Sequence, residues 1–242
     1  MINILIIPDV HGEKSWKIPA DAAILAGKKI IFLGDYADGY DITSNECIAN
    51  LKQIILLKRM HPKLVTLLLG NHDFAYVFNE MGTSGFDPLA AFDYYQVFQK
   101  NWSLFDLAWG YTNEDGKYTL FTHAGLTKSF YKSILWEIED ENSKLHRLLK
   151  DVDFSILPLH ELLNYIKDDN DLLWEIGRAR NGYYLSGSIV WADKSELLRE
   201  PYPGINQVVG HTCGYSIDIQ IRNGNTLYFT DNLYRLPLSI TL

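Results

Sequence analysis

The sequence predicts an α/β fold in which helices connect the strands of a largely parallel sheet. Three observations predict it: apolar segments that end on polar residues, helical patterns between them, and a hairpin signal near the C-terminus that indicates a second sheet. The apolar or β-branched segments lie within residues 2–12, 29–39, 64–73, 118–126 and 206–214. Because open α/β sheets bind ligands just outside the carboxyl ends of their strands, we expect these five polar ends to meet at one edge and build one site.

A helix is predicted between the second and third of these segments. Thr43 and Glu46 have the spacing of a capping box, apolar residues then recur at helical intervals, and Pro62 follows the last turn. This stretch therefore joins two strands into a strand–helix–strand unit.

The second half of the chain predicts helices and two hairpins. Residues 87–101 have a helical pattern, and a hairpin is expected around residues 113–116. Residues 129–176 predict two or three helices that are inserted before the fifth strand and overhang the site. The Asn223-Gly224 pair, between alternating apolar and polar residues, predicts the hairpin of the second sheet.

Length and composition are those of a folded globular protein. The chain has 242 residues, of which 47% are hydrophobic and 21% are charged. No internal repeat or linker-like segment interrupts it, so we expect one domain over residues 1–242 with a helical elaboration at about residues 127–190.

The charge and the cysteine content exclude several classes of protein. A formal net charge of -8 and a pI near 5.3 argue against broad binding to nucleic acid or to an anionic membrane surface. Cys47 and Cys213 are too few for a disulfide scaffold, which favours a reducing compartment. The apolar run at residues 2–7 is too short for a signal peptide or a membrane span. We therefore expect a soluble, cytoplasmic protein.

The polar residues at the strand ends are of types that bind metals. Each has an ordinary structural alternative: an Asp in a turn, an Asn or His that caps a helix, or a His buried in the core. Four of the seven histidines nevertheless fall at these ends. The candidate residues are Asp9, His11, Asp35, Asp38, Asn71, His72, His123 and His211. Asp9 and His11 are two apart, so in an extended chain both side chains would point the same way.

Five short motifs carry a resemblance to a known family. They are "DVHG" at 9–12, "GDYAD" at 34–38, "GNHD" at 70–73, "THAG" at 122–125 and "GHT" at 210–212. In this order and at these intervals the chain resembles the calcineurin-like metallophosphoesterase superfamily. The form "GDYADG" is most similar to the serine/threonine phosphoprotein phosphatase branch, including its bacterial and phage members.

The resemblance implies a four-layer α/β/β/α sandwich with a site for two divalent metal ions. It implies that Asp9 and His11 hold the first metal, that Asn71, His123 and His211 hold the second, and that Asp35 bridges both. Carboxylate, imidazole and amide ligands accept manganese, iron or zinc, and we expect manganese. Asn71 is also expected to contact the substrate.

The same resemblance implies a phosphoesterase in which a metal-bridging hydroxide attacks phosphorus in line. His72 is then expected to give a proton to the leaving oxygen, and Asp38 beside it would favour the imidazolium form.

Two departures from the family pattern bear on the substrate site. The phosphatase branch has an arginine where this chain has Gly39, so Arg178 and Arg180 are candidate replacements for gripping phosphate; the alternative for each is a solvated surface arginine. Many branches have a histidine where this chain has Cys213, for which we expect a small buried thiol rather than a thiolate ligand.

The leading functional hypothesis is a metal-dependent phosphatase acting on a phosphorylated protein or a small phosphorylated substrate. The main alternative among enzymes is a hydrolase of nucleotides or dinucleoside polyphosphates. The alternative from another class is a non-catalytic metal-binding scaffold, which would have no need of His72.

Overall fold

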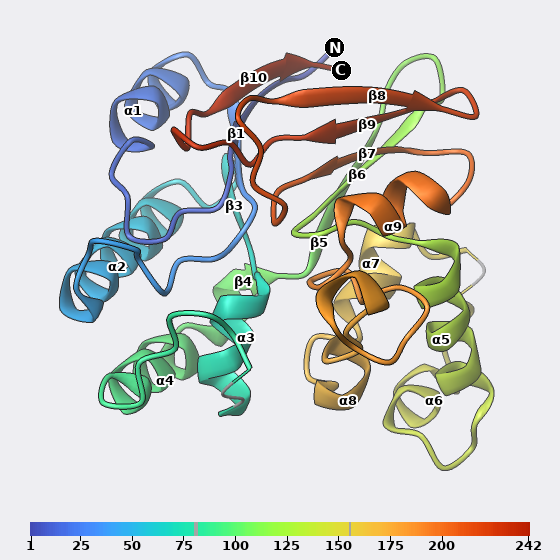
Figure 1. Ribbon diagram of the computed structural model, residues 1–242. Coiled ribbons are helices and arrows are strands. Elements are labelled where there is room, and N and C mark those ends of the chain that lie inside the picture. Colours follow the sequence, from blue (N-terminus) through green and yellow to red (C-terminus); the bar gives the residue numbers. More distant parts are fainter. Residues whose placement is uncertain (80–81, 155) are drawn as a thin grey trace. The chain divides into compact units, whose positions relative to one another are not determined.

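The computed structural model describes residues 1–79, 82–154 and 156–242 (Figure 1). In these ranges the strands form two five-stranded sheets, and each sheet belongs to its own compact unit. Unit 1 comprises residues 1–106, 213–217 and 230–242, and unit 2 comprises residues 107–212 and 218–229.

The sheet of unit 1 is mostly parallel and has the strand order β10-β1-β2-β3-β4. The first four strands in the chain pair in parallel, and β10 pairs antiparallel with β1 at the edge. Nearly every residue of β1, β2 and β3 is buried, as expected for parallel strands that are covered on both faces. The strands are β1 (Asn3–Ile7), β2 (Lys29–Phe32), β3 (Val65–Leu68), β4 (Phe105–Asp106) and β10 (Leu238–Thr241).

The helices of unit 1 pack on this sheet and on one another. Contacts join α1 to β1 and β2, α2 to β3 and α4, and α3 to α4. The predicted capping box is confirmed, because Thr43 accepts from the Glu46 N–H and the Glu46 carboxylate accepts from the Thr43 N–H. The elements are α1 (Lys17–Leu25), α2 (Ser44–Met60), α3 (Asn71–Phe78), α4 (Ala91–Lys100) and the 3-10 turn η1 (Trp102–Leu104). The helix predicted over residues 87–101 thus begins four residues later, since Asp87 forms a turn with the Leu89 N–H.

The sheet of unit 2 is mixed and has the order β5-β6-β7-β9-β8. Both predicted hairpins are confirmed: β5 pairs antiparallel with β6, and β8 pairs antiparallel with β9. Asn223 and Gly224 have φ values of 51° and 76°, as a tight turn with the twist of a hairpin requires. The strands are β5 (Ala108–Thr112), β6 (Tyr118–Thr122), β7 (Asn206–Val209), β8 (Asp218–Arg222) and β9 (Asn225–Phe229).

Four α-helices, rather than the two or three predicted, lie between β6 and residue 176 in the described part of the chain. The predicted helical stretch is broken into separate helices by residues that begin new ones. Ser143 accepts from the His146 N–H at the start of α6, and Pro158 directly precedes α7. The helical elements of unit 2 are α5 (Lys128–Glu139), α6 (Lys144–Leu149), α7 (Leu159–Asn164), α8 (Asn170–Leu173), the 3-10 turn η2 (Arg178–Arg180) and α9 (Lys194–Arg199).

The fold class is confirmed as a mixed α/β structure with two sheets flanked by helices. The expectation that all five polar ends gather on one sheet edge is wrong. Strands β1, β2 and β3 belong to the sheet of unit 1, whereas β6 and β7 belong to that of unit 2. The reason is that β6 enters its sheet through the hairpin with β5 and then pairs with β7.

None of the helices in the described ranges combines the length and apolar character needed to span a bilayer.

Candidate metal centre

Three predicted site residues of unit 1 come together where its parallel strands end. His11, Asp35 and His72 follow β1, β2 and β3, and one side-chain donor atom from each lies within 4.8 Å of the other two. Neighbouring parallel strands end at the same edge of a sheet, which is why residues far apart in sequence meet here. A cluster of two imidazoles and a carboxylate can hold a divalent metal ion.

The start of α3 brings the loops after β2 and β3 into close contact. The His72 N–H donates to Asp35 Oδ1 at 3.0 Å. A Cβ on Gly70 would lie 2.1 Å from that same oxygen, so only glycine allows this approach. The loop after β3 therefore needs Gly70 in order to place the Asp35 carboxylate.

Asp73, to which the sequence analysis gave no role, ties these two loops together. Its carboxylate accepts from the N–H groups of Gly70 and Asp35 at 2.9 Å and from that of Tyr36 at 2.8 Å. An acidic residue at the third position of a helix is a capping signal that could have indicated this contact. The helix begins at Asn71 with Gly70 as its cap.

His11 is held in an orientation that suits a metal ligand. Its Nδ1 lies 2.9 Å from the carbonyl oxygen of Ala37 and 3.0 Å from that of Asp38, so Nδ1 carries the hydrogen. Nε2 then faces Asp35, 3.6 Å from Oδ2. Burial lowers the pKa of His11 more than the nearby Asp35 raises it. The neutral imidazole, fixed through its other nitrogen, is the form that binds metals.

His72 forms a close pair with Asp38. The His72 Nδ1 lies 2.7 Å from Asp38 Oδ2, and the second oxygen of Asp38 accepts from the Tyr76 hydroxyl. Burial lowers the pKa of His72, but Asp35 and Asp38 outweigh it and raise the pKa to about 9. Since Nδ1 is engaged, Nε2 is the nitrogen that can bind a metal or give up a proton.

Several of the predicted site residues have unusual backbone conformations. His11, Asp35, Asp38 and His211 have φ values of 41°, 50°, 59° and 64°. Such values are uncommon outside glycine, and the strained conformations of non-glycine residues cluster at functional sites. The prediction that Asp9 and His11 lie in an extended chain is wrong, because β1 ends at Ile7 and His11 lies in a turn.

Buried acidic groups in unit 1 far outweigh the buried positive charge near them. The buried aspartates of this unit in the described ranges are Asp9, Asp35, Asp38, Asp73 and Asp231. Buried carboxylates are costly unless cations or hydrogen bonds compensate them. Asn71 is buried as well and offers an amide oxygen. Carboxylates, imidazoles and an amide are the donor types that fit divalent cations, so these residues fit the metals that the family motifs imply.

Arg235 is a functional candidate that the sequence analysis missed. Its Nη1 donates to the carbonyl oxygen of Asp9 at 3.0 Å and lies 3.3 Å from Asp231 Oδ1. Burial and the charge of Asp9 raise the pKa of Asp231 to about 8. Arg235 lies beyond the last motif, and no local pattern in the sequence marks it.

The two remaining predicted histidines form a pair in unit 2. His123 follows β6 and His211 follows β7, and His123 Nε2 lies 3.1 Å from His211 Nδ1. The Trp191 ring packs edge-on against His211, with ring centroids 6.1 Å apart. Two imidazole nitrogens at this separation can bind one cation together after a small adjustment.

Of the two candidate arginines, only Arg180 is firmly placed. Arg180 pairs with Asp193 at 3.0 Å and donates to the Thr212 hydroxyl at 2.9 Å, next to His211 in the chain. Its loop is anchored by the buried Glu196 carboxylate, which accepts from the Ala179 N–H at 3.0 Å. Arg178 is exposed.

Cys213 differs from the expectation. It is exposed rather than buried, and desolvation raises the pKa of its thiol to about 11. The thiol is therefore protonated near neutral pH, as expected for a residue that is not a thiolate ligand.

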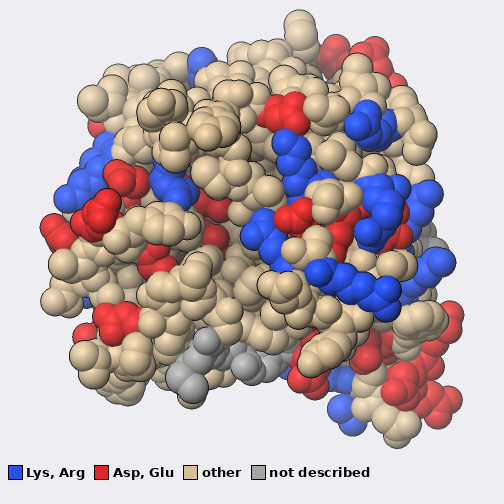
Figure 2. All heavy atoms as spheres, viewed as in Figure 1, with Lys and Arg blue, Asp and Glu red and all other residues tan. Residues whose placement is uncertain are grey.

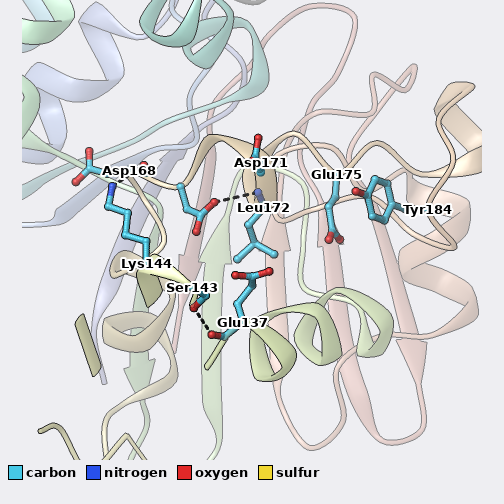
Figure 3. Close-up of a pocket in the computed structure, with 9 residues that line it drawn as sticks. Glu137, Ser143, Lys144, Asp168, Asp171, Leu172, Glu175 and Tyr184 are labelled. Atoms are coloured by element: carbon cyan, nitrogen blue, oxygen red, sulfur yellow. Dashed lines mark hydrogen bonds between the residues drawn. The ribbon is translucent and has the colours of Figure 1, made fainter. Parts of the chain in front are cut away.

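A separate acidic cavity lies among the helices of unit 2 (Figure 3). It has a volume of about 420 Å³, and the described residues that line it include none of the predicted site residues. Glu175, which accepts from the Ser133 hydroxyl at 3.0 Å, lies at its wall. Burial raises the pKa of Glu175 to about 7, with a smaller effect from Glu137.

Charges are mixed on the face of the molecule that Figure 2 shows, where lysine and arginine lie among acidic side chains. Side chains of opposite charge therefore lie close to one another on this face.

The sequence profile of the calcineurin-like phosphoesterases matches residues 2–215. The chain belongs to this family. The predictions of the family and of a metal-dependent phosphoric ester hydrolase are thereby confirmed. The family uses divalent metal ions, and the donor cluster of His11, Asp35 and His72 is a place where this phosphoesterase can hold one.

Solved structures of phosphatases are similar to this phosphoesterase. A mutant cold-active protein tyrosine phosphatase superposes with a TM-score of 0.52 at 16% identity, over 94% of this chain and 70% of that one. A second structure of a cold-active protein tyrosine phosphatase gives 0.52 at 17% identity, over 94% and 69%. A protein serine/threonine phosphatase from Saccharomyces cerevisiae gives 0.47 at 18% identity, over 95% and 67%. The first two structures are similar to this chain in fold. No curated protein matches the chain in sequence.

Proposed function

We propose that this phosphoesterase hydrolyses phosphomonoesters with two divalent metal ions, in the manner of the serine/threonine phosphoprotein phosphatases. The observation that carries the proposal is the cluster in unit 1, where His11, Asp35 and His72 converge and His72 is paired with Asp38. In this proposal His11 and Asp35 are metal ligands, whereas His72 binds no metal and is the proton donor. A phosphoesterase of this kind needs both functions.

The proposed ligands are residues of the five motifs. Asp9 and His11 would hold one ion, Asn71, His123 and His211 would hold the other, and Asp35 would serve both. The support is the order of the five motifs, the buried acidic groups of unit 1 and the facing imidazoles of unit 2. We expect manganese, with iron and zinc as alternatives, because these donor types accept all three.

Bound divalent cations supply positive charge against the phosphoryl oxygens and acidify water. The chain itself supplies orientation and a proton. Asp38 holds the Nδ1 hydrogen of His72, which leaves Nε2 to protonate the leaving oxygen. In this proposal Asn71 and Arg180 contact the phosphate.

The proposed substrate is a phosphorylated protein, with small phosphomonoesters as alternatives. The support is the "GDYADG" motif, which is most similar to the phosphoprotein phosphatase branch. Because Gly39 stands where that branch has an arginine, we expect Arg180 to be the cation that grips the phosphate, in contrast to the exposed Arg178.

The test is hydrolysis of p-nitrophenyl phosphate and of a phosphoserine peptide with manganese added, comparing the parent with His72→Asn. Loss of a general acid typically costs a factor of about 100 to 10,000 in rate, and we expect the peptide reaction to fall in this range. His61→Asn, at the end of α2, is the matched control and should retain full activity.

Equal rates of the parent and His72→Asn on both substrates would defeat the proposed role of His72. A metal-loaded protein that hydrolyses none of the phosphoesters offered, including nucleotides and dinucleoside polyphosphates, would favour the non-catalytic scaffold instead.

A further inference from the structure

The hydroxyl of Tyr76 extends the pair formed by His72 and Asp38 into a chain of three side chains. Asp38 uses Oδ2 for the His72 Nδ1, at 2.7 Å, and Oδ1 for the Tyr76 hydroxyl. The Asp87 N–H donates to the same hydroxyl at 2.8 Å. Because this N–H occupies the acceptor side of the oxygen, the hydroxyl hydrogen is directed at Asp38.

The ring of Tyr76 is fixed by its neighbours. Only 1% of Tyr76 is exposed, and its ring stacks on Phe86 and Tyr94 with centroid distances of 4.6 and 4.2 Å. Tyr76 also lies four residues after His72 on α3, so the helix places both side chains on one face. The hydroxyl is therefore a rigid donor at a fixed distance from the histidine.

In the described part of the chain, the hydrogen bonds of the Asp38 carboxylate go to His72 and Tyr76, one to each oxygen. Gly85 packs close to the same side chain, since a Cβ added at Gly85 would lie 3.3 Å from the Asp38 Cβ. A carboxylate bonded through one oxygen can turn about its terminal torsion, whereas one bonded through both oxygens is held in a plane. The Tyr76 bond thus fixes the plane in which Asp38 meets His72.

We propose that Tyr76 is a positioning residue for the reaction: it holds Asp38 so that Asp38 aims His72 at the leaving oxygen. This inference rests on the proposed function of His72 as the proton donor. Misplacement of a catalytic group by a fraction of an ångström to an ångström lowers rates strongly, so the loss of this bond is expected to slow only the step that needs the proton.

The decisive readout is the dependence on the leaving group. An alkoxide such as that of serine needs a proton in order to leave, whereas p-nitrophenolate is a weak base and leaves without one. We expect Tyr76→Phe to lower kcat for a phosphoserine peptide by about tenfold, while kcat for p-nitrophenyl phosphate changes by less than about twofold. A purely structural defect would lower both rates alike.

The matched control is Tyr94→Phe. This substitution removes a hydroxyl from the same aromatic stack, but no hydrogen bond joins that hydroxyl to Asp38 among the described residues. It should lower the two rates equally or not at all. Tyr76→Phe keeps the stacked ring and removes only one hydrogen bond, so the variant is expected to fold.

The effect of Tyr76→Phe is then measured again in the His72→Asn background. The tenfold loss on the peptide should disappear there, because Tyr76 acts through a histidine that is no longer present. A loss of equal size in both backgrounds, or an equal loss on both substrates, would overturn the inference and leave the role of His72 intact. If His72→Asn alone leaves the peptide rate unchanged, the proposed function itself has failed.

Discussion

Replacing Glu175 by Gln should stabilise the protein at alkaline pH and leave its stability at acid pH unchanged. Glu175 is 8% exposed and lies at the wall of the acidic cavity of unit 2, where burial and the neighbouring Glu137 and Asp169 raise its pKa from 4.5 to about 7. Between these two values the folded state keeps a proton that the unfolded state has lost. The stability of the parent therefore falls as the pH rises through this window.

The magnitude follows from the size of the shift. A pKa change of about 2.5, from 4.5 to about 7, corresponds to about 3.4 kcal/mol. Because the side chain borders a cavity rather than the closed core, solvent screening reduces the expected effect to about 1–2 kcal/mol. Glutamine does not titrate, and its amide oxygen can still accept from the Ser133 hydroxyl.

The assay is urea unfolding of the parent and of Glu175→Gln at pH 4.5 and pH 8. The variant should be more stable by about 1–2 kcal/mol at pH 8 and equal within about 0.5 kcal/mol at pH 4.5. Glu141→Gln, at an exposed position between α5 and α6, is the control and should change neither value. A variant that is no more stable than the parent at pH 8 would refute the reasoning.

Further predictions concern the metal centre, the phosphate site and a helix cap. Gly70→Ala places a Cβ 2.1 Å from a carboxylate oxygen of Asp35, so it should lower the free energy of unfolding by at least about 1–3 kcal/mol and reduce manganese binding measured by calorimetry. The control is Gly27→Ala, whose Cβ would meet nothing within 4 Å. It should lower the free energy of unfolding by about 1 kcal/mol, because Gly27 has a positive φ, and leave manganese binding intact. Arg180→Ala should lower kcat/KM for a phosphopeptide by about 10-fold to 100-fold, whereas the control Arg178→Ala should change it by less than about twofold. Equal effects of the two substitutions would contradict the choice of Arg180 as the phosphate-binding arginine. Chelation of metals should abolish activity and lower the melting temperature, because it removes the stabilisation of about 2.7 kcal/mol that a bound metal gives at 100 times its Kd. Added manganese should restore both. Activity that survives chelation would argue against a metal-dependent reaction. Thr43→Ala should cost about 1 kcal/mol in urea unfolding without a change in kcat, because it removes the side-chain cap of α2.

Features with local signals were predictable from the sequence. The start of α2 at Ser44 follows from the capping box of Thr43 and Glu46, and the β8–β9 hairpin follows from Asn223-Gly224. Each depends on residues within a few positions of one another, so backbone geometry and side-chain hydrogen bonds fix them before any long-range contact forms.

The residues of the candidate site were also marked in the sequence, but the backbone at one of them differs from the expected conformation. Asp9 and His11 were expected in an extended chain, whereas His11 lies in a turn with φ of 41°. The "DVHG" motif identified these residues because metal binding restricts which residue types can serve as ligands. It did not reveal the backbone conformation of His11, whose N–H donates to the Asp35 carbonyl oxygen and whose Nδ1 contacts those of Ala37 and Asp38, all in the loop after β2.

The sequence by itself determined the family, the residue types of the candidate metal centre and the elements that have strong caps or turns. Only the tertiary structure decided that the five polar strand ends divide between two sheets. It alone brought Tyr76 to Asp38, Asp73 to the loop after β2, and Arg235 to Asp9. The physical reason is distance along the chain: pairing of strands and burial of charged groups depend on partners tens to hundreds of residues away, and no local pattern encodes them.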